Sequence, residues 1–481
     1  MQLTFIGMIQ LVLGGLVILV GRPGSTLVFL LFSALFEGSA ALVLPALGGS
    51  TVPPVQFALP FVLMRIFAPK GGLSGYFPDA LRANLWLALF CFYGVALSYL
   101  GPRLFGGTVN VAPMKTPMTE NLFFVVPLAP TTQNLNAGIY MTSALLLALC
   151  AYILARCEGA QKALVSASIG CGWFLIATGL LDVAGRGTPI EDFLKLFRNG
   201  NYEQMSAEVD GMVRIAGIMP ESSTYAGACF VFLMVNAEMW YRSIAVRSTA
   251  PVALALMLML VLSTSSTAYV ALASYAAFFI LRALLLPGLA PRGKLQETLV
   301  LVGAAVFLAA VAMAILPRML DAVSGTVLSM TVEKSASSSG QQRLFWAGQG
   351  LTLARATFGI GVGPGSFRSS SNIMAILGSM GVIGILSYIL YLLAVFQPAR
   401  RSSYGLGDDA AQTLGGALAS AAILGLIPAA VTSPIANPAA TFSLLAGAAL
   451  AIRPARPARR KERSAAAGER AAVPAAIARR R

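Results

Sequence analysis

The feature that most constrains this sequence is a succession of long apolar runs that recurs along nearly its whole length. Each run approaches the ~20 residues that a helix needs to cross about 30 Å of hydrocarbon. Of the 481 residues, 57% are hydrophobic and only 11% are charged, whereas a soluble domain carries roughly 25% charged residues. A single buried core cannot absorb so much apolar surface, so the sequence predicts an all-α integral membrane protein.

The runs predict about 12 to 13 transmembrane helices within a membrane domain of residues 1–452. In chain order the expected spans are roughly 3–20, 26–48, 55–69, 82–101, 135–156, 163–184, 222–241, 249–266, 268–287, 296–316, 372–396, 412–431 and 434–452. The number stays open because Glu37 lies in the middle of the second run. That segment is either re-entrant or a full span whose glutamate is satisfied between helices.

The distribution of Lys and Arg predicts which side of the membrane each connection faces. If residues 453–481, a basic tail typical of disorder, are cytoplasmic, every short basic connection falls on the same side. These connections contain Lys70 and Arg82, Arg156 and Lys162, Arg242 and Arg247, Arg282, Arg292 and Lys294, and Arg400 and Arg401. Three long connections, about 102–134, 185–221 and 317–371, then face outward.

Composition also excludes several kinds of chemistry. The chain has no histidine, which excludes His-based metal sites and Ser–His or Cys–His catalysis. The cysteines lie mostly in apolar runs and form no C-x-x-C pair, so we interpret them as small buried hydrophobes. Because the positive-inside pattern explains the net charge of +15, nucleic-acid binding is not expected.

The first of three polar segments at the expected outer face runs from Val213 to Ala226 and leads into a membrane helix. Ser222 or Ser223 is suited to cap that helix, and Glu221 lies near its positive end. One interpretation is a capped helix start in which Glu221 pairs with a nearby cation. The other places Arg214 and Glu221 on one rim, where they hold an anion and deprotonate a hydroxyl.

The second segment, Ser263–Tyr269, is a hydroxyl-rich turn between two apolar runs. It is either a tight connection between helices or a lining for a sugar or phosphate site.

The third segment runs from Arg343-Leu-Phe-Trp346 to the glycine-rich stretch Gly359–Arg368. Glycine backbone N–H groups can form an anion nest, but neither a P-loop pattern nor a strand–helix context accompanies them. A flexible connector is the alternative interpretation.

Together these segments resemble the O-antigen ligase and polymerase family, the Wzy- and WaaL-like bacterial membrane glycosyltransferases. The resemblance covers roughly residues 1–450. It rests on Arg214, Gly217, Glu221 and Ser222; the run Ser263–Tyr269; Arg343 and Trp346; Gly361, Gly363, Gly365, Ser366 and Phe367; and, early in the chain, Gly48, Gly49, Ser50, Pro53 and Pro54.

The resemblance implies a GT-C-like fold in a bacterial inner membrane, with long periplasmic loops and a cytoplasmic C-terminus. It implies transfer of a glycan from undecaprenyl diphosphate to an acceptor hydroxyl at the periplasmic face. The implied partners are the lipid-linked donor and acceptor and membrane lipid, with chain-length regulators or export proteins as further candidates. No cofactor, nucleotide sugar or obligatory metal is implied.

Chemistry at the outer face then suggests roles for individual residues. Arginine supplies planar, permanently charged donors for a departing diphosphate, so Arg214 and Arg343 are assigned as catalytic, with Glu221 activating the acceptor hydroxyl. The expected substrate-binding residues are Arg368, Ser222, Ser265, Tyr269, Gly361, Gly363 and Gly365. Solvated loop charges such as Arg318 and Arg355 are weaker candidates.

The absence of histidine favours one reaction within the family. Ligases of this family are expected to use a histidine in the last large periplasmic loop, so the sequence favours a polymerase of lipid-linked repeat units for exopolysaccharide, capsule or O-antigen. A ligase or oligosaccharyltransferase of the same family is one alternative. A flippase or transporter of lipid-linked sugars is another, although it should line its cavity with charges that are few here.

Overall fold

A computed structural model describes residues 2–45, 49–69, 72–114, 123–200, 208–209, 212–263, 265–285, 297, 338–404 and 410–452. Nearly all of the expected span 296–316, the basic tail 453–481, Thr264 and Arg318 lie outside these residues.

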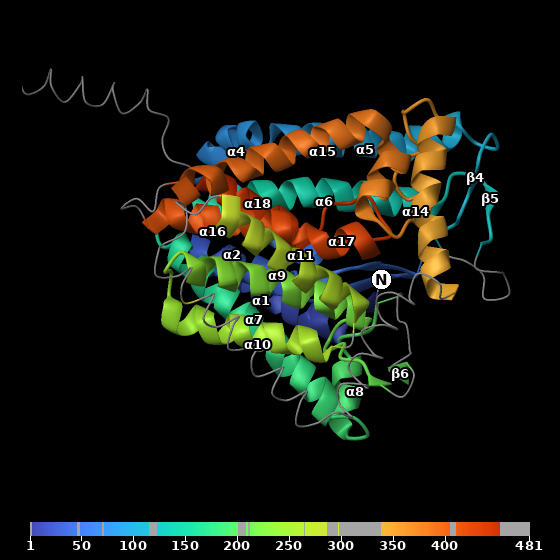
Figure 1. The fold of residues 1–481 in the computed structure, drawn as a ribbon. Coiled ribbons are helices and arrows are strands. Elements are labelled where there is room, and N and C mark those ends of the chain that lie inside the picture. Colours follow the sequence, from blue (N-terminus) through green and yellow to red (C-terminus); the bar gives the residue numbers. More distant parts are fainter. Residues whose placement is uncertain are drawn as a thin grey trace, which may run out of the picture.

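The described chain is mostly helical (Figure 1). Its helices are α1 (Phe5–Val20), α2 (Pro23–Ser33), α3 (Pro54–Phe67), α4 (Phe77–Ala83), α5 (Leu85–Leu104), α6 (Thr132–Ala155), α7 (Ala160–Ala184), α8 (Pro189–Lys195), α9 (Ser222–Tyr241), α10 (Val246–Leu262), α11 (Ser266–Leu285), α14 (Ser338–Ala356), α15 (Asn372–Tyr404), α16 (Ala410–Leu424), α17 (Leu426–Thr432) and α18 (Ala440–Ala451), with a 3-10 turn at Leu73–Tyr76. Short strands are β1 (Gln2–Leu3), β2 (Leu42–Leu44), β3 (Ser50–Val52), β4 (Asn110–Val111), β5 (Val126–Pro127), β6 (Glu208–Val209) and β7 (Met212–Val213).

Within the described residues, five helical segments are long and apolar enough to cross a membrane. They are Leu85–Leu104, Thr132–Ala155, Ala160–Ala184, Asn372–Phe396 and Thr413–Thr432, and shorter apolar helices accompany them. These helices indicate a multi-pass membrane protein, which confirms the expected class. The expectation of about 12 to 13 spans in a GT-C-like arrangement stays a prediction.

The segment that contains α1 and α2 is closed at its two ends by strand pairing. Thr4 caps α1 by accepting the N–H of Gly7 at 3.1 Å, and α2 ends at Ser33, so Glu37 lies in the turns that follow rather than inside a helix. Strand β1, which precedes α1, pairs antiparallel with β2, which follows α2. Both ends of the α1–α2 pair therefore meet at one end of the bundle.

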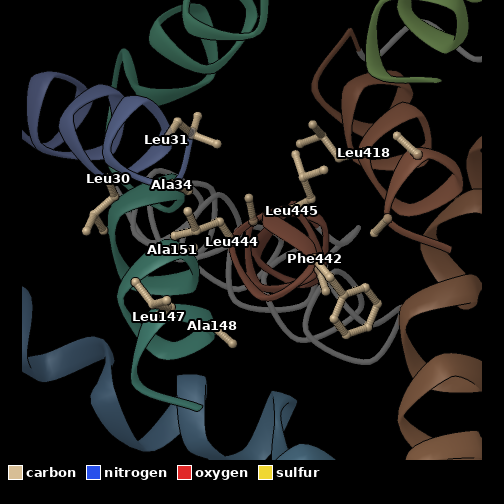
Figure 2. Packing of buried hydrophobic residues seen from close by; sticks show 14 of the residues in the cluster. Leu30, Leu31, Ala34, Leu147, Ala148, Ala151, Leu418, Phe442, Leu444 and Leu445 are labelled. Carbon is tan, nitrogen blue, oxygen red and sulfur yellow. The ribbon is translucent and has the colours of Figure 1, made fainter. Parts of the chain in front are cut away.

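The core is dominated by small and branched aliphatic side chains. Figure 2 shows Leu444 and Leu445 of α18 among side chains of α2, α6 and α16. A Cβ on Gly447 would lie 2.2 Å from the carbonyl oxygen of Ala148, so glycine is required for the close approach of α18 to α6.

The described parts of all three long connections gather at one end of the bundle, which we name the loop end. Figure 1 shows β4, β5, α8, β6 and α14 there, together with the N-terminus, whereas α4 lies at the opposite end. At that opposite end the Arg156 guanidinium donates to the carbonyl oxygen of Ala451 at 3.4 Å and links the ends of α6 and α18.

Helix α14 crosses the loop end transverse to the bundle, and α15 kinks before running along it (Figure 1). The kink is at Gly381, whose φ of 57° and ψ of −147° are not helical. Next to it, the N–H of Val382 donates to the carbonyl oxygen of Gly359 at 2.9 Å. The glycine-rich stretch after α14 is thereby fixed against the kink of α15.

Candidate functional site

Glu221 and Arg343 each lie within electrostatic reach of Arg214 at the loop end. Burial lowers the pKa of Arg214; the carboxylate of Glu221 raises it and the positive charge of Arg343 lowers it further. The Nε of Arg214 is buried and has no hydrogen-bond partner within the described residues. The structure thus brings Arg214, a guanidinium with an unused donor, within reach of Glu221 in the same segment and of Arg343, which is distant in sequence. The catalytic roles of all three stay predictions.

Glu221, rather than a serine, occupies the N-cap position of α9. Its backbone is extended, with φ −153° and ψ 161°, and its side chain does not cap the helix. The Glu221 carboxylate instead accepts a hydrogen bond from the Ser223 hydroxyl. The expectation that Ser222 or Ser223 caps α9 is therefore wrong, because the helix begins at Ser222 and both side chains are buried.

The backbone that follows Arg214 is held by the carboxylate of Asp182, a residue that was not predicted from the sequence. Asp182, in the last turn of α7, accepts the N–H groups of Ala216 at 2.8 Å and Gly217 at 3.2 Å and pairs with Arg198. A charged residue at the end of the expected span 163–184 was the available signal, since carboxylates in apolar runs are rare.

Arg343 enters the site from the first turns of α14. Its carbonyl oxygen accepts the Ser370 hydroxyl at 2.5 Å, which connects α14 to the segment before α15. Nearby, the guanidinium of Arg368 lies over the Trp346 ring, with 4.1 Å between Cζ and the ring centroid. The backbone N–H of Arg368 donates to the carbonyl oxygen of Ala112 at 2.9 Å. Stacking fixes the plane of the guanidinium against the indole ring, and the substrate-binding role of Arg368 stays a prediction.

The glycine-rich stretch is packed into the fold. Gly361, Gly363 and Gly365 have φ values of 99°, 93° and 81°. The N–H of Gly361 donates to the Thr357 hydroxyl at 3.0 Å, and that of Gly363 donates to the Ser379 carbonyl oxygen at 2.9 Å. These contacts use the two N–H groups within the protein, so the glycines have an evident packing role. Their predicted contact with substrate stays a prediction.

Ser265 and Tyr269 form the turn into α11. Ser265 is buried, and the Tyr269 hydroxyl donates to the Val261 carbonyl oxygen at 3.1 Å, which closes the connection from α10. Within the described residues, no hydrogen bond or ion pair joins either side chain to Arg214, Glu221 or Arg343. The geometry matches the tight-turn interpretation, and a role in substrate binding stays a prediction.

A second charged cluster lies at the opposite end of α9. Glu238 is fully buried and pairs with Arg242, the C-cap residue of α9, and with Arg282 of α11 at 2.9 Å. Arg242 also donates to the Ser420 hydroxyl of α16 at 3.3 Å. The cluster ties three helices together. It was not predicted because Arg242 and Arg282 were assigned to short basic connections, whereas the structure places both against the buried Glu238.

A cavity of about 220 Å³ opens at the loop end, between the end of α5 and the start of α6. Its lining consists of Ser98, Tyr99, Arg103, Pro130, Thr131, Thr132, Asn134 and Leu135. Asn134 also donates to Pro364 and Ser366, each at 2.9 Å, so the cavity adjoins the glycine-rich stretch. Across the described part of the chain, no three His, Cys, Asp or Glu side chains gather as a metal site requires.

Comparison with protein-family models and with curated proteins finds no match for this chain.

Proposed function

We propose that this protein is a polymerase of undecaprenyl-diphosphate-linked oligosaccharide repeat units and that it acts at the periplasmic face of a bacterial inner membrane. The observation that carries the proposal is the meeting of Arg214, with its unused buried donor, Arg343 and Glu221 at the loop end. Two cations beside one carboxylate suit a reaction that releases a diphosphate and removes a proton from a hydroxyl.

In the proposed reaction the acceptor hydroxyl oxygen attacks the anomeric carbon of the donor glycan. The new glycosidic C–O bond forms as the bond from that carbon to the diphosphate oxygen breaks. The hydroxyl proton moves to the carboxylate of Glu221, and Arg214 and Arg343 stabilise the negative charge that develops on the departing lipid diphosphate. The Glu221 carboxylate already accepts a hydrogen bond from the Ser223 hydroxyl. This contact supports the proposal that Glu221 can also accept a hydrogen bond from the acceptor hydroxyl.

Low dielectric surroundings strengthen this electrostatic role. Arg214 is half-buried, and burial lowers its pKa, yet an arginine remains charged at neutral pH. A charge that is already partly desolvated interacts more strongly with a diphosphate than a solvated one does.

The proposal is tested by deleting the gene and sizing both the surface polysaccharide and the lipid-linked pool. The expected result is the loss of long chains and accumulation of single repeats on undecaprenyl diphosphate at the outer leaflet. Long chains that persist on the lipid carrier would refute the polymerase. Accumulation at the cytoplasmic leaflet would favour a flippase instead.

The site is tested by complementing the deletion with Arg214→Ala or Arg343→Ala. Because removal of one charge-stabilising donor typically costs on the order of 10²- to 10³-fold in rate, polymer should disappear while the protein stays abundant in the membrane. Lys at either position should rescue poorly. Arg355→Ala is the matched control, since this exposed arginine lies on the same helix as Arg343. Near-normal chain lengths in both alanine variants would exclude the assigned site.

A further inference from the structure

Asp182 is the centre of a hydrogen-bonded cluster that adjoins Arg214 but does not include its side chain. Oδ2 accepts the N–H groups of Ala216 and Gly217, and Oδ1 pairs with Arg198. Asp182 is only 7% exposed, so both carboxylate oxygens are engaged within the protein.

Two arginines complete this cluster by holding carbonyl oxygens of the same segment. Arg186 donates to the carbonyl oxygen of Arg214 at 2.8 Å, and its guanidinium lies 4.0 Å from the Asp182 carboxylate. Arg198 donates through Nε to the carbonyl oxygen of Gly217 at 2.9 Å. Four backbone groups that follow Arg214 Cα are therefore bound by charged side chains, namely the carbonyl oxygens of Arg214 and Gly217 and the N–H groups of Ala216 and Gly217. Hydrogen bonds to charged groups are stronger than those between neutral ones.

The segment also has a conformation that needs this support. Gly217 has a φ of 59°, and a Cβ there would lie 3.0 Å from the Tyr225 ring. Since β7 ends at Val213 and α9 begins at Ser222, the intervening residues form no ladder or helix of their own. Side chains from α7 and from the turn after α8 supply the hydrogen bonds that a regular element would supply.

We propose that Asp182, together with Arg186 and Arg198, is a positioning group that fixes the backbone of residues 214–217 and thereby presets the Arg214 guanidinium for an anionic ligand. A preset donor binds an anion without the cost of ordering a loop. The identity of the anion as a diphosphate rests on the proposed function, whereas the fixing of the segment does not.

The backbone effect is tested by hydrogen exchange of the full-length protein in lipid nanodiscs. In Asp182→Asn the amides of residues 214–219 should exchange at least about 10-fold faster than in wild type, because a charged acceptor of two N–H groups is lost. Asp182→Glu should restore part of the protection. The matched control is Asp192→Asn, which makes the same substitution in an exposed pair on α8. Unchanged exchange in Asp182→Asn would overturn the proposal.

The link to Arg214 is tested by a double-mutant cycle with inorganic diphosphate as the probe. Asp182→Asn and Arg214→Ala should each weaken binding about 10-fold or more, and the double variant should bind no worse than Arg214→Ala alone. Additive losses would show that Asp182 does not act through Arg214 and would refute the positioning role. A wild type that does not bind diphosphate would count against the proposed function, and the exchange measurement would still decide whether Asp182 fixes the segment.

Discussion

Phe358 carries a backbone conformation that an aromatic residue rarely adopts. It follows α14 with a φ of 53°, and its side chain is 91% exposed. Left-handed backbone costs an L-residue roughly 1 to 2 kcal/mol relative to glycine. Phe358→Gly should therefore raise the free energy of unfolding by about 1 kcal/mol, measured by denaturant titration in detergent micelles. A loss of stability instead would show that the exposed ring contributes a contact, for example with lipid, that outweighs the strain.

Substitution by alanine at two glycines of the same region should change the stability of the protein in opposite directions. A Cβ on Gly363 would lie 2.2 Å from the Leu97 carbonyl oxygen, whereas one on Gly348, inside α14, meets nothing within 4 Å. Gly363→Ala should lower stability by on the order of 2 kcal/mol or more, and Gly348→Ala should raise it by up to about 1 kcal/mol. Thermal unfolding of both variants in one detergent provides the comparison, and equal effects would contradict it.

At this scale the sequence predicted residue types better than contacts. It singled out Arg214, Glu221 and Arg343, which meet, since charged residues in a hydrophobic chain are few and conspicuous. It missed that Glu221 is the N-cap, because the choice between adjacent polar residues depends on tertiary contacts such as those of Asp182. The glycines were predicted to bind an anion through their backbone N–H groups. No sequence pattern shows which acceptor within the protein those N–H groups bind instead.

Helices α9, α11 and α16 are joined by the buried cluster of Glu238, Arg242 and Arg282. Removal of the carboxylate leaves two buried arginines without their counter-charge, and loss of one partner from a buried ion pair typically costs about 3 to 5 kcal/mol. Glu238→Gln should therefore lower the thermal unfolding temperature and the amount of protein in the membrane. Glu191→Gln on α8 is the control because its ion pair is solvent-exposed; equal behaviour of the two variants would argue against a structural cluster.

The lengths of the helices were only partly predictable. The runs that form α5, α6 and α7 were recognised because an uninterrupted apolar segment of that length is typical of a membrane-spanning helix. Residues 26–45 of the expected span 26–48 form most of α2, turns and β2. Pairing with β1 and β3 satisfies backbone groups of β2, and hydropathy does not report such pairing. The kink of α15 was also missed, because Gly381 adopts its conformation through contact with the distant Gly359.

For the whole molecule, the charge distribution predicts that the loop end faces the periplasm. Thr108 is an exposed residue at the loop end, between α5 and β4, and Glu158 is an exposed residue between α6 and α7 at the opposite end. A membrane-impermeant maleimide should label Thr108→Cys in intact spheroplasts and Glu158→Cys only after lysis. The reverse pattern would invert the topology and place Arg214 in the cytoplasm.

The small sheet of β1, β2 and β3 also bears on how the chain is made. Pairing of residues 2–3 with 42–43, and of 42–44 with 50–52, means that all three strands of this sheet precede α3, which begins at Pro54. The sheet thus fastens the two ends of the α1–α2 segment to each other without any residue from α3 onward. During biogenesis this closure can hold α1 and α2 together until α3, α6 and α7, against which they pack, have entered the membrane.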